Sequence, residues 1–449
     1  MKKKLLSLLL LVCMCLTAFA GCDFKSIFGK GDDSSTEIVE VDYAGQVTLN
    51  MESETLKQEV TVLNYIDGDT THFNVPNTVV DRGILKARYI AVNTPESTGK
   101  IEEWGKKAAR FTKSKLAEAE SIIIETDGTD WEVDSTGDRH LVWVWYKNEG
   151  ALGYRNLNIE LLQEGLAIGS KAGFTRYGDT CTQAINQAIT LKKHVHSSEK
   201  DPDYYYGEAV EMDIKEIRLN IEDYVGMKVA FEGVVTYYSN DGVYVEAYDE
   251  ATDKVYGTYV YYGHFLTSNG KKVLSVGNRV RIVGSVQYYE TGKSYQISDL
   301  QYDPFDLTNP NNIQKLDDEK HTPYYTETTV EQFHSEVTID LADESKTFDY
   351  AELALGTTVE MKNLVVESMY TTDNDGANDG AISITCKVGE QTITVRTVVL
   401  TDADGELITQ DYFRGKTIDV KGVIDTYKGA YQVKLFSLDD VVVHQTNAN

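Results

Sequence analysis

A repeated seven-residue interval that begins at a glycine is the sequence feature that most restricts the fold of this chain. Four strand-like segments of alternating apolar residues each begin with a glycine and end seven residues later, three of them at a second glycine. The segments span residues 226–233, 277–284, 356–363 and 415–422. Glycine within a strand usually marks a bulge or the tight corner of a small barrel. Two modules, over about residues 208–305 and 326–445, are therefore expected to be small closed sheets.

Each module has short strands with such corners and no convincing long helix. This pattern resembles the OB-fold, a five-stranded Greek-key barrel that often binds oligonucleotides or sugars. Any other small antiparallel barrel would also fit. We expect two C-terminal all-β, OB-like barrels. Tyrosines such as Tyr237 and Tyr244 would offer the module over residues 208–305 a stacking platform for bases, or simply reflect the preference of tyrosine for strands.

The length of 449 residues predicts about three domains, at about 150 residues each. The block before the two modules, residues 46–205, mixes two periodicities. Residues 102–119 have apolar side chains at helical spacing, whereas 121–125 and 141–146 follow strand patterns. An α+β domain is therefore expected there.

The N-terminus has the features of a secretory signal. Three lysines precede an apolar run over residues 5–20, which is too short for a comfortable transmembrane span. The run leads into Ala-Gly-Cys22, which resembles the lipobox of bacterial lipoproteins. The resemblance implies a signal peptide over 1–22, lipidation of Cys22 and a flexible tether over 23–45. Acyl chains on Cys22 would hold the protein on the extracellular face of the bacterial cell membrane; an ordinary signal with an incidental cysteine is the alternative.

The net charge of −28 at pH 7 bears on possible partners. An acidic surface repels a polyanion such as nucleic acid. Most of the acidic excess follows Gly207, outside the first block. The charge thus argues against a DNA-coating role for the C-terminal half and leaves the first block open to a nucleic-acid partner.

Five ordered segments of the first block carry the strongest functional signal. They are Ile-Asp-Gly-Asp-Thr at 66–70, Arg-Tyr-Ile-Ala-Val-Asn-Thr-Pro-Glu at 88–96, a Trp-Gly-x-x-Ala helix from 104, Asp-x-x-Gly-Asp-Arg from 134, and a helix ending in Gly-Leu-Ala at 165–167. In this order they resemble the thermonuclease family (staphylococcal nuclease-like, SNase). The resemblance implies an OB-fold-type five-stranded barrel with helices, and an endonuclease that hydrolyses phosphodiester bonds of DNA or RNA.

Phosphodiester hydrolysis requires a base for the attacking water and positive groups for the charge that grows on the phosphate. By the resemblance, Glu96 is the base. Arg88 and Arg139 would clamp the phosphate, because a guanidinium matches its oxygens in a bidentate fashion. One extra residue, Asp138, separates Arg139 from the glycine of its motif, which makes Arg139 the less secure of the two arginines.

The resemblance also implies a bound calcium ion. Side-chain oxygens of Asp69 and Asn93 and the backbone carbonyl of Thr94 would be its ligands, and Asp67 would lie in the shell behind them. Asn93 stands where the family commonly has Asp. Since calcium affinity depends on the number of charged ligands, we expect weaker binding at this site.

The aromatic pair that the family carries after the Gly-Leu-Ala helix is absent, so Phe174 and Tyr177 become the candidates for stacking on a base. The alternative function is a catalytically weakened nuclease fold that serves as a nucleic-acid or envelope-binding module. Retention of Glu96 and Arg88 favours the enzyme, because a pure binding protein needs no base beside its metal. No protein partner can be inferred.

Overall fold

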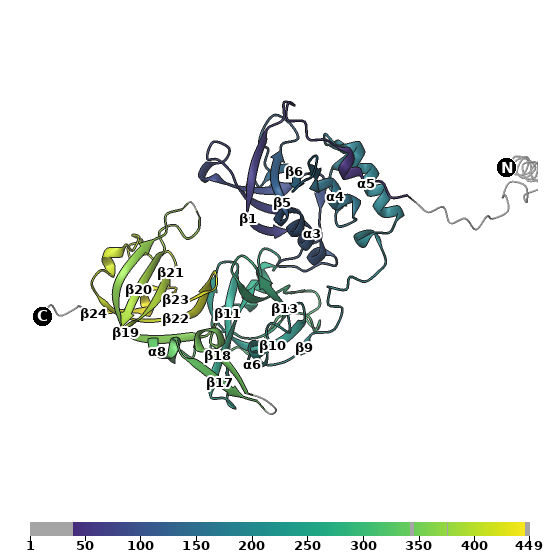
Figure 1. Cartoon of the computed structure of the whole chain (residues 1–449). Coiled ribbons are helices and arrows are strands. Elements are labelled where there is room, and N and C mark those ends of the chain that lie inside the picture. The colour runs from purple at the N-terminus through teal and green to yellow at the C-terminus, as the bar shows by residue number, and fades with distance from the viewer. Residues whose placement is uncertain (1–38, 342–344, 375, 445–449) are drawn as a thin grey trace, which may run out of the picture. The chain divides into compact units, whose positions relative to one another are not determined.

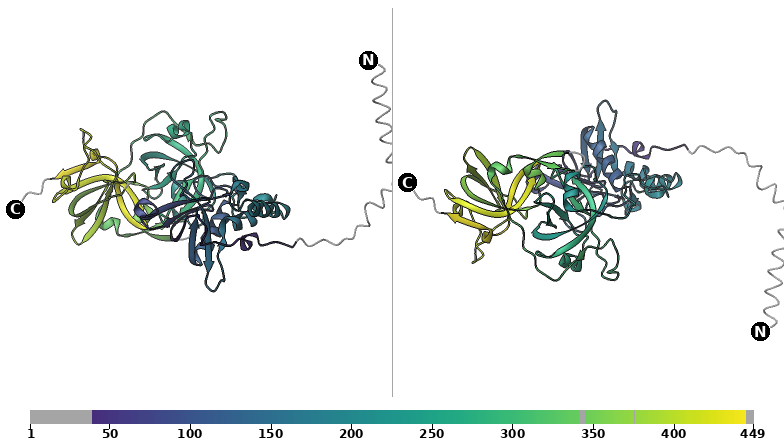
Figure 2. Two further views of the ribbon diagram at one scale, coloured as in Figure 1. Left: turned by 90° about the horizontal axis from the view of Figure 1, so that it is seen from above. Right: turned by 90° about the horizontal axis from the view of Figure 1, so that it is seen from below.

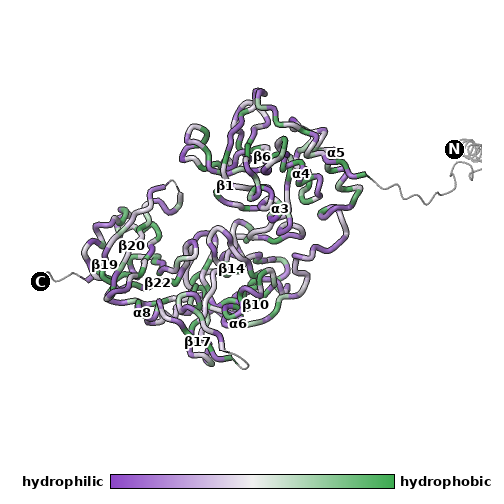
Figure 3. Tube along the Cα trace, viewed as in Figure 1, coloured by the Kyte–Doolittle hydropathy of each residue, from purple (hydrophilic) through white to green (hydrophobic). Residues whose placement is uncertain are grey.

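Alternating apolar residues make β-strands the main regular element of the described chain. The computed structural model describes residues 39–341, 345–374 and 376–444. Figure 3 shows that hydrophobic and hydrophilic residues alternate along the trace. The expected signal peptide with Cys22, and most of the expected tether, lie outside the described residues.

The first barrel has five strands that close into a ring. They are β1 (Lys57–Asp67), β2 (Thr70–Asn74), β3 (Ile84–Tyr89), β5 (Ala119–Glu125) and β6 (His140–Asn148). They pair in the order β3-β2-β1-β5-β6, and a parallel pairing of β3 with β6 closes the ring. Trp143, Trp145 and Phe73 fill its core. The predicted barrel with helices is thus confirmed.

Helices give this domain its α+β character (Figure 1). They are α2 (Tyr43–Gln46), α3 (Gly105–Ala117), α4 (Leu157–Gln163) and α5 (Gly178–Thr190). The short strands β4 (Val92–Asn93) and β8 (Ile168–Gly169) pair with each other, and β7 (Arg155–Asn156) extends the edge of β6. Ala44 of α2 is fully buried in the core, so the domain begins before the expected residue 46. None of the helices within the described residues is long and apolar enough to cross a membrane.

Two further five-stranded barrels follow. The second contains β10 (Lys228–Ser239), β11 (Gly242–Asp249), β12 (Lys254–Tyr261), β13 (Arg279–Tyr289) and β14 (Ser294–Ser298), with β9 (Val210–Glu211) and β15 (Gln314–Lys315) at its edges. The third contains β19 (Thr358–Thr371), β20 (Ile382–Val388), β21 (Gln391–Thr397), β22 (Thr417–Tyr427) and β23 (Ala430–Leu435), with β16 (Thr326–Glu327) and β24 (Val441–His444) at its edges. In Figures 1 and 2 strands dominate these parts, whereas the longer helices belong to the first barrel.

All three barrels share one strand order. Numbered along each barrel, the strands pair in the ring 1-2-3-5-4, and the fourth strand returns to pair with the first. The third and fifth strands are parallel in every case. The three closed five-stranded barrels are therefore one topology used three times.

The repeated glycine segments overlap the first and fourth strands of the two C-terminal barrels, and these strands pair antiparallel. Val229 lies opposite Gly284 in the second barrel, and Val359 lies opposite Gly422 in the third. A Cβ added to Gly284 would lie 2.6 Å from the carbonyl oxygen of Ser298. Glycine is required there because a neighbouring backbone approaches too closely for any side chain.

The C-terminal modules are mostly β, as expected. They also include short helices of four to six residues: α6 (Ile214–Leu219), α7 (Ser268–Val273), α8 (Val330–Phe333) and α9 (Tyr350–Leu353). A hairpin of β17 (Glu336–Asp340) and β18 (Ser345–Asp349) precedes the third barrel. Ile313 lies in the core of the second barrel, which therefore extends beyond the expected residue 305.

Tyr237 and Tyr244 do not form a stacking platform for bases. The ring of Tyr237 stacks on Phe436, with 4.5 Å between centroids. The hydroxyl of Tyr244 donates to Oδ1 of Asp425 at 3.0 Å, and Tyr244 is 3% exposed. Both tyrosines therefore contact residues of the third barrel.

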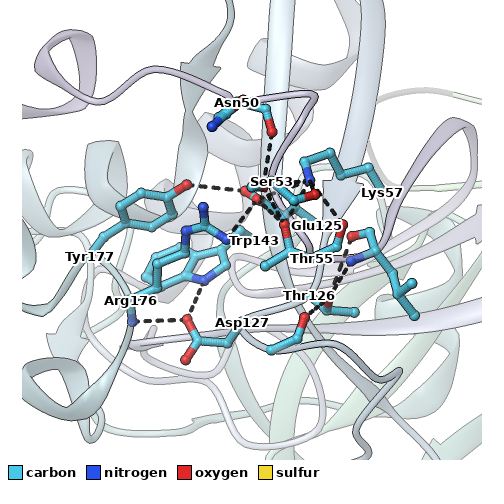
Figure 4. A network of polar contacts seen from close by, with 12 residues as sticks. Asn50, Ser53, Thr55, Lys57, Glu125, Thr126, Asp127, Trp143, Arg176 and Tyr177 are labelled. Atoms are coloured by element: carbon cyan, nitrogen blue, oxygen red, sulfur yellow. Dashed lines mark hydrogen bonds and ion pairs between the residues drawn. The ribbon is translucent and has the colours of Figure 1, made fainter.

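A buried polar network braces the first barrel (Figure 4). The carboxylate of Glu125, which is fully buried, accepts hydrogen bonds from Thr55 Oγ1 at 2.6 Å, Trp145 Nε1 at 2.9 Å and Tyr177 hydroxyl at 3.2 Å. The cations of Lys57 and Arg176 lie 3.8 Å and 3.4 Å from the same carboxylate. The network joins β1, β5 and β6 to the start of α5.

Candidate active site

The tight turn between β1 and β2 places two aspartates beside each other. Asp69 is 1% exposed, and its Oδ2 accepts a hydrogen bond from the backbone N–H of Thr94 at 2.9 Å. Its Oδ1 accepts from Thr70 Oγ1 at 3.1 Å and from the guanidinium of Arg88. Burial raises the pKa of Asp69, and the charge of Arg88 partly opposes that rise.

Arg88 joins two of the predicted calcium ligands. It lies on β3 directly opposite Thr70 of β2. One of its terminal nitrogens donates to Asp69, and the other donates to Oδ1 of Asn93 at 2.6 Å. The oxygens of Asp69 and Asn93 thus converge on one cationic group.

The donor set around Asp69 suits a hard cation. Within the described residues, no three His, Cys, Asp or Glu side chains gather as a metal site. The predicted set needs only one carboxylate, because an amide oxygen and a backbone carbonyl complete it, and such oxygens are ordinary calcium ligands. The hydroxyl oxygen of Thr94 is buried with no hydrogen-bond partner among the described groups. These residues therefore fit the predicted ion.

The loop that follows β4 holds Glu96. Its backbone N–H donates to Oε2 of Glu102 at 3.2 Å, and its carbonyl accepts from the N–H of Glu102 at 2.9 Å. Helix α3 begins immediately beyond, at Gly105. A Cβ on Gly105 would collide with the carbonyl of Glu96. The Trp-Gly motif thus lets the helix start against the backbone of the proposed base.

Asp67 is more than a turn residue. It is 8% exposed, and its Oδ1 accepts from Ser97 Oγ at 2.7 Å. Burial, with a hydrogen bond and charge repulsion from Glu96, raises the pKa of Asp67 well above its ordinary value. The carboxyl group of Asp67 therefore lies beside that of Glu96.

Arg139 lines a cleft together with Arg88 and Glu96, despite the extra residue Asp138. Its Nε donates to Oδ2 of Asp134 at 2.7 Å, and the carbonyl of Arg139 accepts from the backbone N–H of Asp134 at 2.8 Å. The cleft has a volume of about 230 Å3. Its lining residues are Ile66, Asp67, Thr70, His72, Lys86, Arg88, Glu96, Thr98, Asp138 and Arg139. Both predicted arginines and the predicted base therefore face one cleft.

The two stacking candidates lie elsewhere. Neither Phe174 nor Tyr177 lines the cleft. Tyr177 packs edge-on against Trp143 and Trp145, with 4.9 Å and 5.7 Å between ring centroids, and bonds to Glu125. Tyr177 is therefore a packing residue, which corrects the stacking assignment. Phe174 is 94% exposed, and its role as a stacking residue stays a prediction.

His72, Lys86 and Thr98 also line the cleft, although the sequence does not single them out, and Asp138 stands out in the sequence only as the extra residue of its motif. His72 and Lys86 lie opposite each other on β2 and β3, two positions from the pair Thr70 and Arg88. Because side chains two positions apart share a face of a sheet, this register would have identified them. The strand pairing was the missing information.

The second barrel supports the loop behind Glu96. Residues Asp42–Asn449 form one compact unit. The side-chain amide of Gln287 donates to the carbonyl of Ser97 at 2.7 Å, and the backbone N–H of Asp299 donates to the carbonyl of Gly99 at 2.6 Å. The segment after the proposed base is therefore fixed by a different domain.

Comparison with known proteins agrees with this geometry. No curated protein matches the chain. Residues 86–195 match the model of the family described as staphylococcal nuclease homologue. The matched range contains Arg88, Asn93, Thr94, Glu96 and Arg139 and leaves out Asp67 and Asp69. The chain thus contains a staphylococcal nuclease-like domain, which suggests a nuclease or nucleic-acid-binding function.

Proposed function

We propose that the protein is a calcium-dependent nuclease that hydrolyses phosphodiester bonds of DNA or RNA. One observation carries the proposal: Arg88, Arg139 and Glu96 line a single cleft beside the convergent oxygens of Asp69 and Asn93. Two fixed cations and a carboxylate are the groups that phosphodiester hydrolysis needs.

In this proposal Glu96 accepts a proton from the attacking water. Its neighbour Asp67 keeps it oriented, and the guanidinium groups of Arg88 and Arg139 hold the equatorial oxygens of the phosphate as their charge grows. A positioned base contributes about 10²–10⁴-fold to such a reaction. By the family resemblance, the product carries a 3′-phosphate.

Asp69, Asn93 and the carbonyl of Thr94 would hold the calcium ion. When bound, the ion supplies positive charge to the phosphate. Because Asn93 brings no charge, Asp69 is the only charged side chain in this ligand set, and the calcium affinity should be correspondingly low.

The calcium requirement tests the proposal. We expect the protein to degrade DNA or RNA with added Ca²⁺ and to stop when the ion is chelated. Asn93→Asp should lower the calcium concentration for half-maximal activity. Asn74→Asp is the matched control, since it adds the same charge to β2 outside the cleft, and should leave that concentration unchanged. Activity that survives chelation would refute the metal assignment.

The missing charge at Asn93 also favours a second candidate, a weakened nuclease fold that only binds nucleic acid. Binding of labelled DNA without cleavage at any calcium concentration would establish it.

We further propose that the protein is anchored by lipid at Cys22 to the outer face of the bacterial membrane. The lipobox-like Ala-Gly-Cys22 supports this. Cys22→Ser should move the protein from the membrane fraction to the medium, and retention in the membrane would contradict it.

A further inference from the structure

A second pair of polar side chains lies two strand positions from Arg88 and Thr70. Thr70 of β2 faces Arg88 of β3, and His72 faces Lys86 in the same register. Two strand residues span about 6.6 Å, which is comparable with the separation of neighbouring phosphates in a nucleic-acid strand. His72 and Lys86 line the same cleft as Arg88.

A carboxylate covers this second pair. Nζ of Lys86 donates to both oxygens of Asp138, at 3.0 Å and 2.7 Å. The lysine side chain is 42% exposed and that of Asp138 is 63% exposed. Ion pairs this exposed are weak and screened by salt, so a competing anion displaces the carboxylate readily. Asp138 is the extra residue of its motif and directly precedes Arg139.

His72 completes the pair from the opposite strand. Its side chain is half-buried. Burial and the charge of Lys86 lower its pKa, while Asp138 opposes that change. The imidazole of His72 can offer a hydrogen bond, and the lysine offers the charge.

We propose that Lys86 and His72 form a second phosphate subsite, which binds the backbone phosphate next to the scissile one and which the carboxylate of Asp138 fills when substrate is absent. The proposal rests on the proposed function, because the neighbouring phosphate is defined by the one held at Arg88 and Arg139. The two oxygens of Asp138 stand where phosphate oxygens would bind Lys86. Asp138 therefore competes with the substrate, and only a chain with at least two phosphates uses the whole cleft.

Two substrates and two variants test the subsite. The assay compares the hydrolysis of dithymidine, which has one phosphodiester, with that of trithymidine, which has two, in the presence of calcium. The subsite gives the wild type a higher kcat/KM on the longer substrate. Lys86→Met should reduce that preference about tenfold, as expected for losing a charged hydrogen bond. Asp138→Asn should strengthen it severalfold by removing the competitor.

Matched controls come from another ion pair of the same barrel. Lys147 and Glu120 lie 3.5 Å apart with side chains 31% and 53% exposed, outside the cleft. Lys147→Met and Glu120→Gln should leave the preference unchanged. Equal losses on both substrates in Lys86→Met, or an Asp138→Asn variant that behaves like Glu120→Gln, would overturn the subsite.

A binding measurement separates this proposal from the proposed function. Fluorescein-labelled dithymidine and trithymidine are titrated in chelator, where no cleavage is expected. Tighter trithymidine binding that Lys86→Met weakens and Asp138→Asn strengthens supports the subsite even if the protein never cleaves. Cleavage without any such length dependence in binding or turnover refutes the subsite and leaves the nuclease in place.

Discussion

Replacing Glu125 by alanine removes the carboxylate on which the polar network of the first barrel converges. Three donors lose their acceptor, and Lys57 is left as a cation whose side chain is only 6% exposed. Removing one partner of a buried ion pair costs about 3–5 kcal/mol. That is a large part of the free energy of unfolding of a typical domain, which is about 5–15 kcal/mol. For a domain of about 150 residues it corresponds to a fall of about 10 °C in Tm.

Tryptophan fluorescence during urea unfolding measures this loss in the first barrel alone. All four tryptophans, Trp104, Trp131, Trp143 and Trp145, belong to that domain. Glu125→Gln keeps an acceptor and should lose less than Glu125→Ala. The control Glu120→Ala lies on the same strand, and its exposed pair with Lys147 is worth at most about 1 kcal/mol. A Glu125→Ala midpoint equal to that of the control would refute the argument that the network braces the barrel.

Two further predictions concern the thiols and the loop behind Glu96. Burial raises the pKa of Cys181 and of Cys386 to about 12, so both stay as neutral, unreactive thiols well above neutral pH. In a protein of residues 39–449, a thiol reagent at pH 8 should label neither cysteine until urea unfolds the protein. Rapid labelling in the folded state would contradict this burial. Gln287→Ala should lower kcat about tenfold, because the carbonyl of Ser97 loses its donor and small misplacements of a catalytic group are costly. Gln314→Ala on the same barrel is the control. Equal kcat values for Gln287→Ala and Gln314→Ala would show that the second barrel does not position Glu96.

Local pattern accounts for the parts of the fold that the sequence predicts. The glycine interval marks strands that pair with each other, because a close backbone approach excludes any side chain at Gly284. Helix α5 has no such signal. Its buried face consists of small residues, Gly178, Cys181, Ala184 and Ala188, in place of the large apolar side chains that usually mark a buried helix face.

The candidate site divides in the same way. Arg88 and Asn93 belong to one contiguous motif, and Arg88 contacts both Asn93 and Asp69. The family resemblance of the ordered motifs was enough to predict that these three residues lie together. His72 and Lys86 depend on strand register, which a single sequence does not reveal. The packing of Tyr237 on Phe436 depends on how separate modules meet, and no periodicity records that.

Single-turnover cleavage of 5′-labelled DNA by residues 39–449 with saturating calcium tests directly whether Glu96 is the base of a nuclease. Glu96 lines the cleft beside two arginines, whereas the nearby Glu103 is exposed and outside it. The wild type and Glu103→Gln should cleave at the same rate, and Glu96→Gln should be slower by about 10²–10⁴-fold. A Glu96→Gln variant that cleaves as fast as the wild type would contradict this role of Glu96.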